Sequence, residues 1–279
     1  MKSAKKHLLI GILMNSYTSD YYKKIYGASL NYLKFAQQFG TPVIIAPDAN
    51  PEDYDLDLLI LPGGPDLSLA LQKPEKYEYG QGKDQPEYTY YYAHTIQKWV
   101  EAGVPMFGIC LGMQALANHF DSTITKDGHG HQINGNMKVV RAKNTKVKVG
   151  ANIINPNSRH HQFVTELGNE LEVLCYGVAA GDEDILDTPK NGTRQKHAEN
   201  ILYNIGTKKE IVELTHIEAF VHKDLRIAGV QWHPEDLLYG IDEHGDWTTH
   251  MIIKWLLSAP TDKEVQQPQA APQTAELSA

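Results

Sequence analysis

Short apolar runs alternate with longer amphipathic stretches through the first half of the chain. The apolar runs cover residues 8–14, 43–46, 58–61 and 105–109, and the amphipathic stretches cover residues 22–39 and 90–100. Buried strands separated by segments of helix length are typical of a parallel sheet with crossover helices. The pattern therefore predicts an α/β fold in which helices flank a mostly parallel central sheet.

The second half of the chain has a different pattern, rich in β-forming segments. These cover residues 137–149, 171–176, 201–205, 211–221 and 227–232. They predict a mixed or antiparallel extension of the sheet within one domain, residues 1–258. Residues 259–279 carry Pro, Gln, Ala and Thr with almost no large apolar side chains. Such a segment cannot bury enough surface to offset the entropy of ordering, so we expect a disordered tail there.

Charge and cysteine usage narrow the classes of partner. The formal net charge is -8 and no run of Lys or Arg stands out, which argues against nucleic acid and anionic membranes and leaves small polar substrates. Two cysteines are too few for a disulfide framework and favour a reducing, cytoplasmic setting. Residues 1–14 imitate a short signal peptide, but a buried first strand fits better because no small-residue cleavage site follows. No apolar stretch approaches the roughly 20 residues that a membrane span requires.

The strongest local signal is a nucleophile between two glycines, Gly108-Ile109-Cys110-Leu111-Gly112, after an apolar strand and before a helix-forming run. This is the strand-to-helix elbow of hydrolases with Cys in place of Ser. Glycines suit the strained turn, and the helix N-terminus favours a thiolate and offers the Leu111 N–H to an oxyanion. The alternative is a cysteine that only packs the core.

A second signal is Trp232-His233-Pro234-Glu235. Pro234 disfavours a helical conformation for His233, and side chains two residues apart in an extended chain point the same way. The sequence therefore predicts that Glu235 orients the imidazole while its other nitrogen faces the thiol. Taken singly, each of the two residues could equally be an ordinary surface residue after a strand.

A third segment is the strand at residues 58–61, which runs into Pro62-Gly63-Gly64. The backbone N–H of Gly63 or Gly64 could complete an oxyanion hole. On its own a Gly-Gly after a strand is more often a plain turn.

Together these three motifs resemble the class I (Triad) glutamine amidotransferases, a family with γ-glutamyl hydrolase and γ-glutamyl-γ-aminobutyrate hydrolase branches. The resemblance covers about residues 7–257. It implies the family's α/β fold, a catalytic triad of Cys110, His233 and Glu235, and hydrolysis of a γ-carboxamide through a γ-glutamyl thioester without a cofactor or metal. It also places a small γ-glutamyl substrate against four further residues: Gln114, His160, His161 and Gln162.

The resemblance leaves the branch open. The residue after the nucleophile is Leu111, as in the glutaminase subunits of biosynthetic amidotransferases, where the γ-aminobutyrate hydrolase branch commonly has Arg. One alternative is therefore a glutaminase subunit that delivers ammonia to a separate synthase. Another is a non-catalytic regulator that keeps the fold. His129 and His131 lack a third ligand at a suitable spacing and are interpreted as loop residues.

Tyrosines gather in the segment of residues 73–92. Tyr88, Tyr91 and Tyr92 have helical spacing and are expected to pack a helix onto the sheet. Tyr77 and Tyr79 lie in a Pro- and Gly-containing loop at the ligand-binding edge expected of an open α/β sheet. We expect these two to influence selectivity among γ-glutamyl amines.

Overall fold

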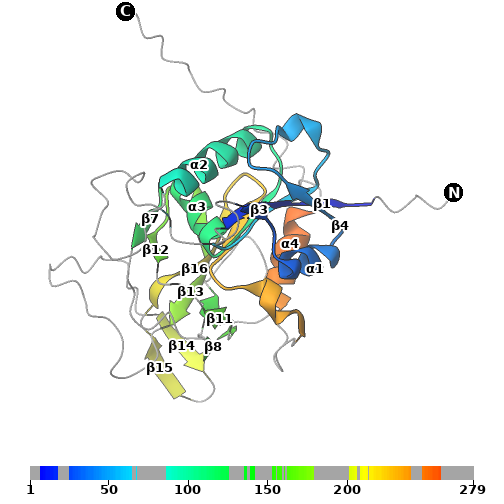
Figure 1. The fold of residues 1–279 in the computed structure, drawn as a ribbon. Coiled ribbons are helices and arrows are strands. Elements are labelled where there is room, and N and C mark those ends of the chain that lie inside the picture. The colour runs from blue at the N-terminus through cyan, green and yellow to red at the C-terminus, as the bar shows by residue number, and fades with distance from the viewer. Residues whose placement is uncertain are drawn as a thin grey trace, which may run out of the picture.

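The computed structural model describes residues 7–17, 25–64, 67, 86–125, 135–136, 139–141, 153–154, 156–158, 160, 162–178, 201–205, 208–212, 214–239 and 247–258. These residues form an α/β fold around one large sheet, with helices on both of its faces (Figure 1). The predicted fold class is confirmed. The proposed tail, residues 259–279, lies outside the described residues, as do residues 73–85 of the tyrosine-containing segment.

One half of the sheet is parallel. Its strands run in the order β17-β6-β5-β1-β4, with the bounds Ile227–Val230, Met106–Ile109, Leu58–Leu61, Leu9–Leu13 and Thr41–Ile45. Each of the four apolar runs in the first half of the sequence is one of these strands. The run near the N-terminus becomes β1, which pairs with β4 on one side and β5 on the other. Its apolar character therefore comes from burial inside the sheet.

The other half of the sheet is antiparallel and begins where β16 pairs with β17. It contains β16 (Leu214–His222), β13 (Leu171–Val178), β9 (Val139–Arg141), β10 (Ile153–Ile154), β12 (Phe163–Glu166) and β7 (Thr123–Thr125). Three small two-stranded sheets accompany it: β2 (Asn15–Tyr17) with β3 (Ile25–Gly27), β8 (Gly135–Asn136) with β11 (Asn157–Ser158), and β14 (Ile201–Ile205) with β15 (Lys208–Val212). Strands from residues 139–141, 171–178 and 214–222 thus form the expected extension, whereas residues 201–205 lie in a separate small sheet and β17 pairs in parallel with β6.

The helices cover the two faces of the parallel half. The α-helices are α1 (Leu30–Gln37), α2 (Pro86–Glu101), α3 (Leu111–His119) and α4 (Trp247–Leu256). Leu58 and Ile60 of β5 pack in the core that α1 and α4 share, whereas Leu59 and Leu61 pack in the core of α2 and α3. Side chains of a strand alternate between its faces, so one apolar run supplies both cores.

The stretch at residues 22–39 is only partly helical. Strand β3 ends at Gly27, and α1 begins at Leu30 after Ser29, whose hydroxyl accepts the Asn31 N–H at 3.3 Å. This serine cap sets the helix start, because its side chain satisfies a first-turn N–H that no carbonyl can reach.

Among the described residues no helix is both long and apolar enough to cross a bilayer.

Candidate active site

Cys110 lies between β6 and α3 on a strained turn. Its φ of 51° and ψ of -108° are outside the regions that L-residues prefer, which is the backbone expected of a nucleophile elbow. Both flanking glycines are needed there. A Cβ at Gly112 would lie 2.1 Å from the Leu61 carbonyl oxygen, and one at Gly108 would lie 2.6 Å from the Gly112 backbone. The chain therefore passes its own backbone at distances that only glycine allows.

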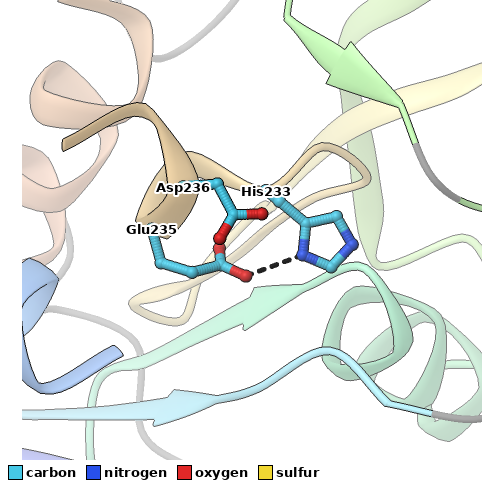
Figure 2. A group of neighbouring side chains, drawn as sticks. All are labelled: His233, Glu235 and Asp236. Atoms are coloured by element: carbon cyan, nitrogen blue, oxygen red, sulfur yellow. Dashed lines mark hydrogen bonds and ion pairs between the residues drawn. The ribbon is translucent and has the colours of Figure 1, made fainter. Parts of the chain in front are cut away.

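His233 and Glu235 meet as the sequence predicts, although the backbone between them differs from the prediction. The imidazole Nδ1 and the Glu235 Oε1 are 2.7 Å apart, and the other ring nitrogen points away from the carboxylates (Figure 2). The expectation of an extended chain through Glu235 is wrong, because η4, a 3₁₀-helix, spans Pro234–Tyr239. Proline fits the first position of such a turn, and the turn folds the carboxylate back onto the ring.

The Cys110 side chain lies close enough to His233 to raise the pKa of the imidazole. Burial of His233 lowers its pKa, but hydrogen bonds to Cys110 and Glu235 and the negative charges of these groups outweigh burial and raise the pKa to about 10. An imidazole with such a pKa is protonated at neutral pH. The site therefore holds a cationic ring between a thiol sulfur and a carboxylate.

The backbone of His233 is fixed by a single side chain. Asn157 donates from Nδ2 to the His233 carbonyl at 3.0 Å and accepts the His233 N–H on Oδ1 at 2.9 Å. One amide thus satisfies both main-chain groups, as a neighbouring strand would. Asn157 comes from β11 in the antiparallel part of the fold, which links that part directly to the triad candidates.

Gly63 packs against the same side chains. A Cβ on it would lie 2.8 Å from Cε1 of His233 and 3.2 Å from Cβ of Cys110. Its N–H donates to the Tyr32 hydroxyl at 2.8 Å, and its carbonyl accepts a hydrogen bond from Nδ2 of Asn15. The N–H of Gly63 is thus already engaged, whereas Gly64 next to it is exposed.

Gln114, His160 and Gln162, the substrate-pocket candidates within the described residues, are buried and bonded to protein groups. The Gln162 side chain makes two hydrogen bonds to the Leu67 backbone: it accepts the N–H at 3.0 Å and donates to the carbonyl at 3.2 Å. Gln114 donates to the Gln162 carbonyl and to the Gln231 side chain, at 2.8 and 3.1 Å.

His160 belongs to the same network. Its Nδ1 is 2.9 Å from the Gln162 carbonyl oxygen, and its Nε2 is 3.6 Å from Oε1 of the buried Glu218. The three candidates are therefore brought together, and one of them, Gln162, fixes the Leu67 backbone. The fourth candidate, His161, lies outside the described residues, as do Tyr77, Tyr79, His129 and His131.

One group of side chains among the described residues has ligand atoms close enough for a metal ion. The ligand atoms of His233, Glu235 and Asp236 lie within 4.8 Å of one another (Figure 2). Nδ1 of His233 is bonded to Glu235, however, and Oδ1 of Asp236 accepts a hydrogen bond from the Asn31 side chain at 2.9 Å. These contacts suit a proton-holding pair better than a metal centre.

Comparison with known proteins agrees with this geometry. The family model of class-I glutamine amidotransferases matches residues 19–244, most of the chain and all three motifs. The chain belongs to the class-I glutamine amidotransferase family.

Relatives in the family include synthase subunits. The chain is 28% identical to the carbamoyl phosphate synthase small chain of Xylella fastidiosa over 170 residues, which are 59% of this chain but 40% of that protein. It is 23% identical to the glutamine amidotransferase-like protein YvdE of Lactococcus lactis over 252 residues, 81% of this chain and 90% of that protein.

Solved structures share the fold at low sequence identity. A glutamine amidotransferase from Thermotoga maritima has a TM-score of 0.52 at 14% identity, covering 94% of this chain and all of the other. PurLQS from the same organism has a TM-score of 0.53 at 15% identity, covering 90% of this chain and 100% of the matched chain.

Sequence reasoning missed three residues that the structure places beside the candidate triad: Tyr32, Asn15 and Asn157. Asn157 lies three residues before His160, a substrate-pocket candidate, and this closeness in sequence is a signal for it. Tyr32 and Asn15 carried no such signal, because an isolated polar residue in a helix or after a strand is usually unrelated to chemistry.

Proposed function

We propose that this amidotransferase-family protein hydrolyses the γ-carboxamide of glutamine, or of another γ-glutamyl amine, with Cys110 as the nucleophile. The observation that carries the proposal is the meeting of three side chains at one point. Cys110 on its strained elbow lies beside His233, with both side chains against Gly63, and His233 is hydrogen-bonded to Glu235 at 2.7 Å. A nucleophile, a base and a group that orients the base are the parts that thiol-dependent acyl transfer needs.

In this mechanism His233, oriented by Glu235, takes the Cys110 proton, and the raised pKa of about 10 favours a ring that holds it. The thiolate attacks the γ-carbonyl carbon, and the C–N bond breaks as His233 gives its proton to the leaving nitrogen. Ammonia or an amine departs. His233 then removes a proton from water, which attacks the γ-glutamyl thioester and releases glutamate and the thiol.

The oxyanion formed in each step needs donors aimed at one point. We assign the Leu111 N–H at the start of α3 and the Gly64 N–H to this role. The Gly63 N–H is the weaker candidate, since it donates to Tyr32. Gln114, His160 and Gln162 remain the candidates for the glutamyl pocket, and Gln162 also fixes the Leu67 backbone.

A second candidate function is a glutaminase subunit that passes ammonia to a synthase partner. Similarity to carbamoyl phosphate synthase small chains, together with Leu111 after the nucleophile, favours it. The chain matches well under half the length of those small chains. Glutaminase activity that rises only on addition of a synthase subunit would support this candidate over the free-standing hydrolase.

The nucleophile provides the most direct test. We expect Cys110→Ala to abolish release of glutamate from glutamine and from a panel of γ-glutamyl amines, with the melting temperature nearly unchanged. Cys175→Ala is the matched control: this thiol is buried in β13, so its loss leaves kcat unchanged and costs about 1–2 kcal/mol of stability. Turnover that survives in Cys110→Ala would contradict the mechanism. An unmodified Cys110 after treatment with a glutamine-analogue electrophile would instead favour a non-catalytic regulator.

A further inference from the structure

Tyr32 lies at the centre of the candidate site, yet it belongs neither to the candidate triad nor to the Gly63-Gly64 turn, called the oxyanion loop below. It sits in the first turn of α1, and its side chain is only 6% exposed. The hydroxyl is 2.8 Å from the Gly63 nitrogen and would be 3.1 Å from a Cβ at Gly63, where His233 and Cys110 are the other close neighbours. The hydroxyl therefore lies at the junction of the oxyanion loop and the catalytic pair.

The direction of the hydrogen bond from Gly63 restricts what the Tyr32 hydroxyl can do. A backbone N–H can only donate, so the phenol oxygen accepts from Gly63 and its own proton is left for another acceptor. Burial raises the pKa of Tyr32 well above its usual value, and the neighbouring Glu235 carboxylate raises it further. The proton therefore stays on the phenol, with Glu235 beside it.

Glu235 has a buried carboxylate oxygen that can accept the Tyr32 proton. The carboxylate is buried, and its Oε1 is used by His233. Its Oε2 has no hydrogen-bond partner among the described residues. A buried carboxylate oxygen without a donor is costly, and the cost is relieved when a neighbouring hydroxyl turns its proton toward it.

The helix that carries Tyr32 is also attached to η4 directly. Asn31, one residue earlier, donates to Oδ1 of Asp236 at 2.9 Å. The first turn of α1 thus faces Glu235 and Asp236 side by side. The titratable groups around the Tyr32 hydroxyl are Glu235 and Asp236 on η4, His233 before it, and Cys110 at the elbow.

We propose that Tyr32 is a positioning residue that accepts the Gly63 N–H and donates to the Glu235 carboxylate. One hydroxyl then fixes the positions of both the oxyanion loop and the carboxylate that orients His233. This inference rests on the proposed function for its catalytic meaning. The contact between hydroxyl and carboxylate is itself independent of which amide is cleaved.

The test measures the reactivity of Cys110 and requires no substrate. In a Cys175→Ala background, the rate of Cys110 alkylation by iodoacetamide is followed against pH. Tyr32→Phe removes the donor, so the Glu235 carboxylate is held less firmly against the imidazole and stabilises the imidazolium less. We expect the midpoint for thiolate reactivity to move to higher pH by about one unit. Tyr54→Phe, a half-buried tyrosine in the other core, leaves the midpoint unchanged.

A double-mutant comparison distinguishes positioning from packing. If Tyr32 acts through Glu235, Tyr32→Phe moves the midpoint in the parent protein but adds nothing in a Glu235→Gln background. An unchanged midpoint in Tyr32→Phe, or an equal shift in both backgrounds, overturns the proposal.

A tyrosine fluorinated beside the hydroxyl at position 32 preserves the packing and is a stronger hydrogen-bond donor, so we expect it to shift the midpoint to lower pH. No shift, or a shift to higher pH, contradicts the proposal as well.

Where glutaminase activity is present, Tyr32→Phe should lower kcat by about tenfold with little change in KM, because Tyr32 does not contact substrate in this scheme. A parent protein without such activity counts against the proposed function alone, since the alkylation measurements still decide the role of Tyr32. A rise in KM with constant kcat would instead mark Tyr32 as a substrate contact and overturn the positioning role.

Discussion

At the scale of single residues, the site depends on a few atoms whose partners are defined. His233 contacts Cys110 on one side and Glu235 on the other, and the resulting pKa of about 10 makes it a cation at neutral pH. Glycines at 63 and 112 permit this arrangement, because a side chain at either would collide with the site or with β5. The chemistry therefore depends as much on missing side chains as on the triad candidates.

The division of work between His233 and Glu235 gives a prediction at this scale. His233→Ala removes the group that holds and returns the proton, so we expect kcat to fall by about 10⁴-fold or more. Glu235→Gln keeps the ring and disturbs only its orientation and charge, so its loss should be roughly tenfold to a hundredfold smaller. Steady-state kinetics of the two single variants and the double variant check this. The double variant should be no slower than His233→Ala, and additive losses would show that the two residues act separately.

At the scale of elements, α1, β11 and η4 bring the site together. Strand β6 and helix α3 present the thiol, while the turn into η4 presents the base and its carboxylate. Helix α1 contacts Asp236 through Asn31 and the Gly63 N–H through Tyr32, and β11 holds the base through Asn157. These contacts come from segments far apart in the chain.

Asn157 provides the test of this arrangement. Asn157→Ala leaves the N–H and the carbonyl of His233 without their side-chain partner, which should cost about 1–3 kcal/mol of positioning and lower kcat by roughly tenfold to a hundredfold. KM should change little. Asn50→Ala is the control, because the Asn50 side chain makes no capping bond to the 3₁₀-helix that follows it. Unchanged kcat in Asn157→Ala would show that the turn at Pro234 holds His233 without help.

At the scale of the whole molecule, we propose one catalytic domain, residues 1–258, that ends with α4. Ile252, Ile253 and Leu256 of α4 are buried in the core shared with α1, and the Ser258 hydroxyl donates to the Trp255 carbonyl at 2.7 Å. The helix is thus part of the domain, while residues 259–279 have no composition suited to a core.

Two truncations check that boundary. Removal of residues 259–279 should leave both the melting temperature and kcat/KM nearly unchanged. Removal of residues 247–279 also deletes α4, and each buried apolar side chain lost with it costs about 1.5–3 kcal/mol, so the domain should no longer fold cooperatively. Thermal unfolding followed by circular dichroism distinguishes the two. A large fall in melting temperature with the shorter truncation would assign the last residues to the folded domain.

The sequence by itself determined the fold class and the identity of the triad candidates. Buried parallel strands must be continuous apolar runs, and a strained elbow must have glycines at 108 and 112, so these features are written locally. The sequence correctly predicted that His233 and Glu235 meet, but the reason was wrong. The 3₁₀-helix η4, and not an extended chain, brings the two side chains together.

Only the tertiary structure decided which other residues reach the site. Tyr32, Asn15 and Asn157 lie on separate elements, and nothing in their local patterns reveals that one hydroxyl and two amides hold Gly63 and His233. The tertiary structure likewise shows that Gln114 and His160 both contact the Gln162 carbonyl, and that the Gln162 side chain is bonded to the Leu67 backbone. Hydrogen bonds between distant segments depend on how the elements pack, and that packing is a property of the whole chain rather than of any motif.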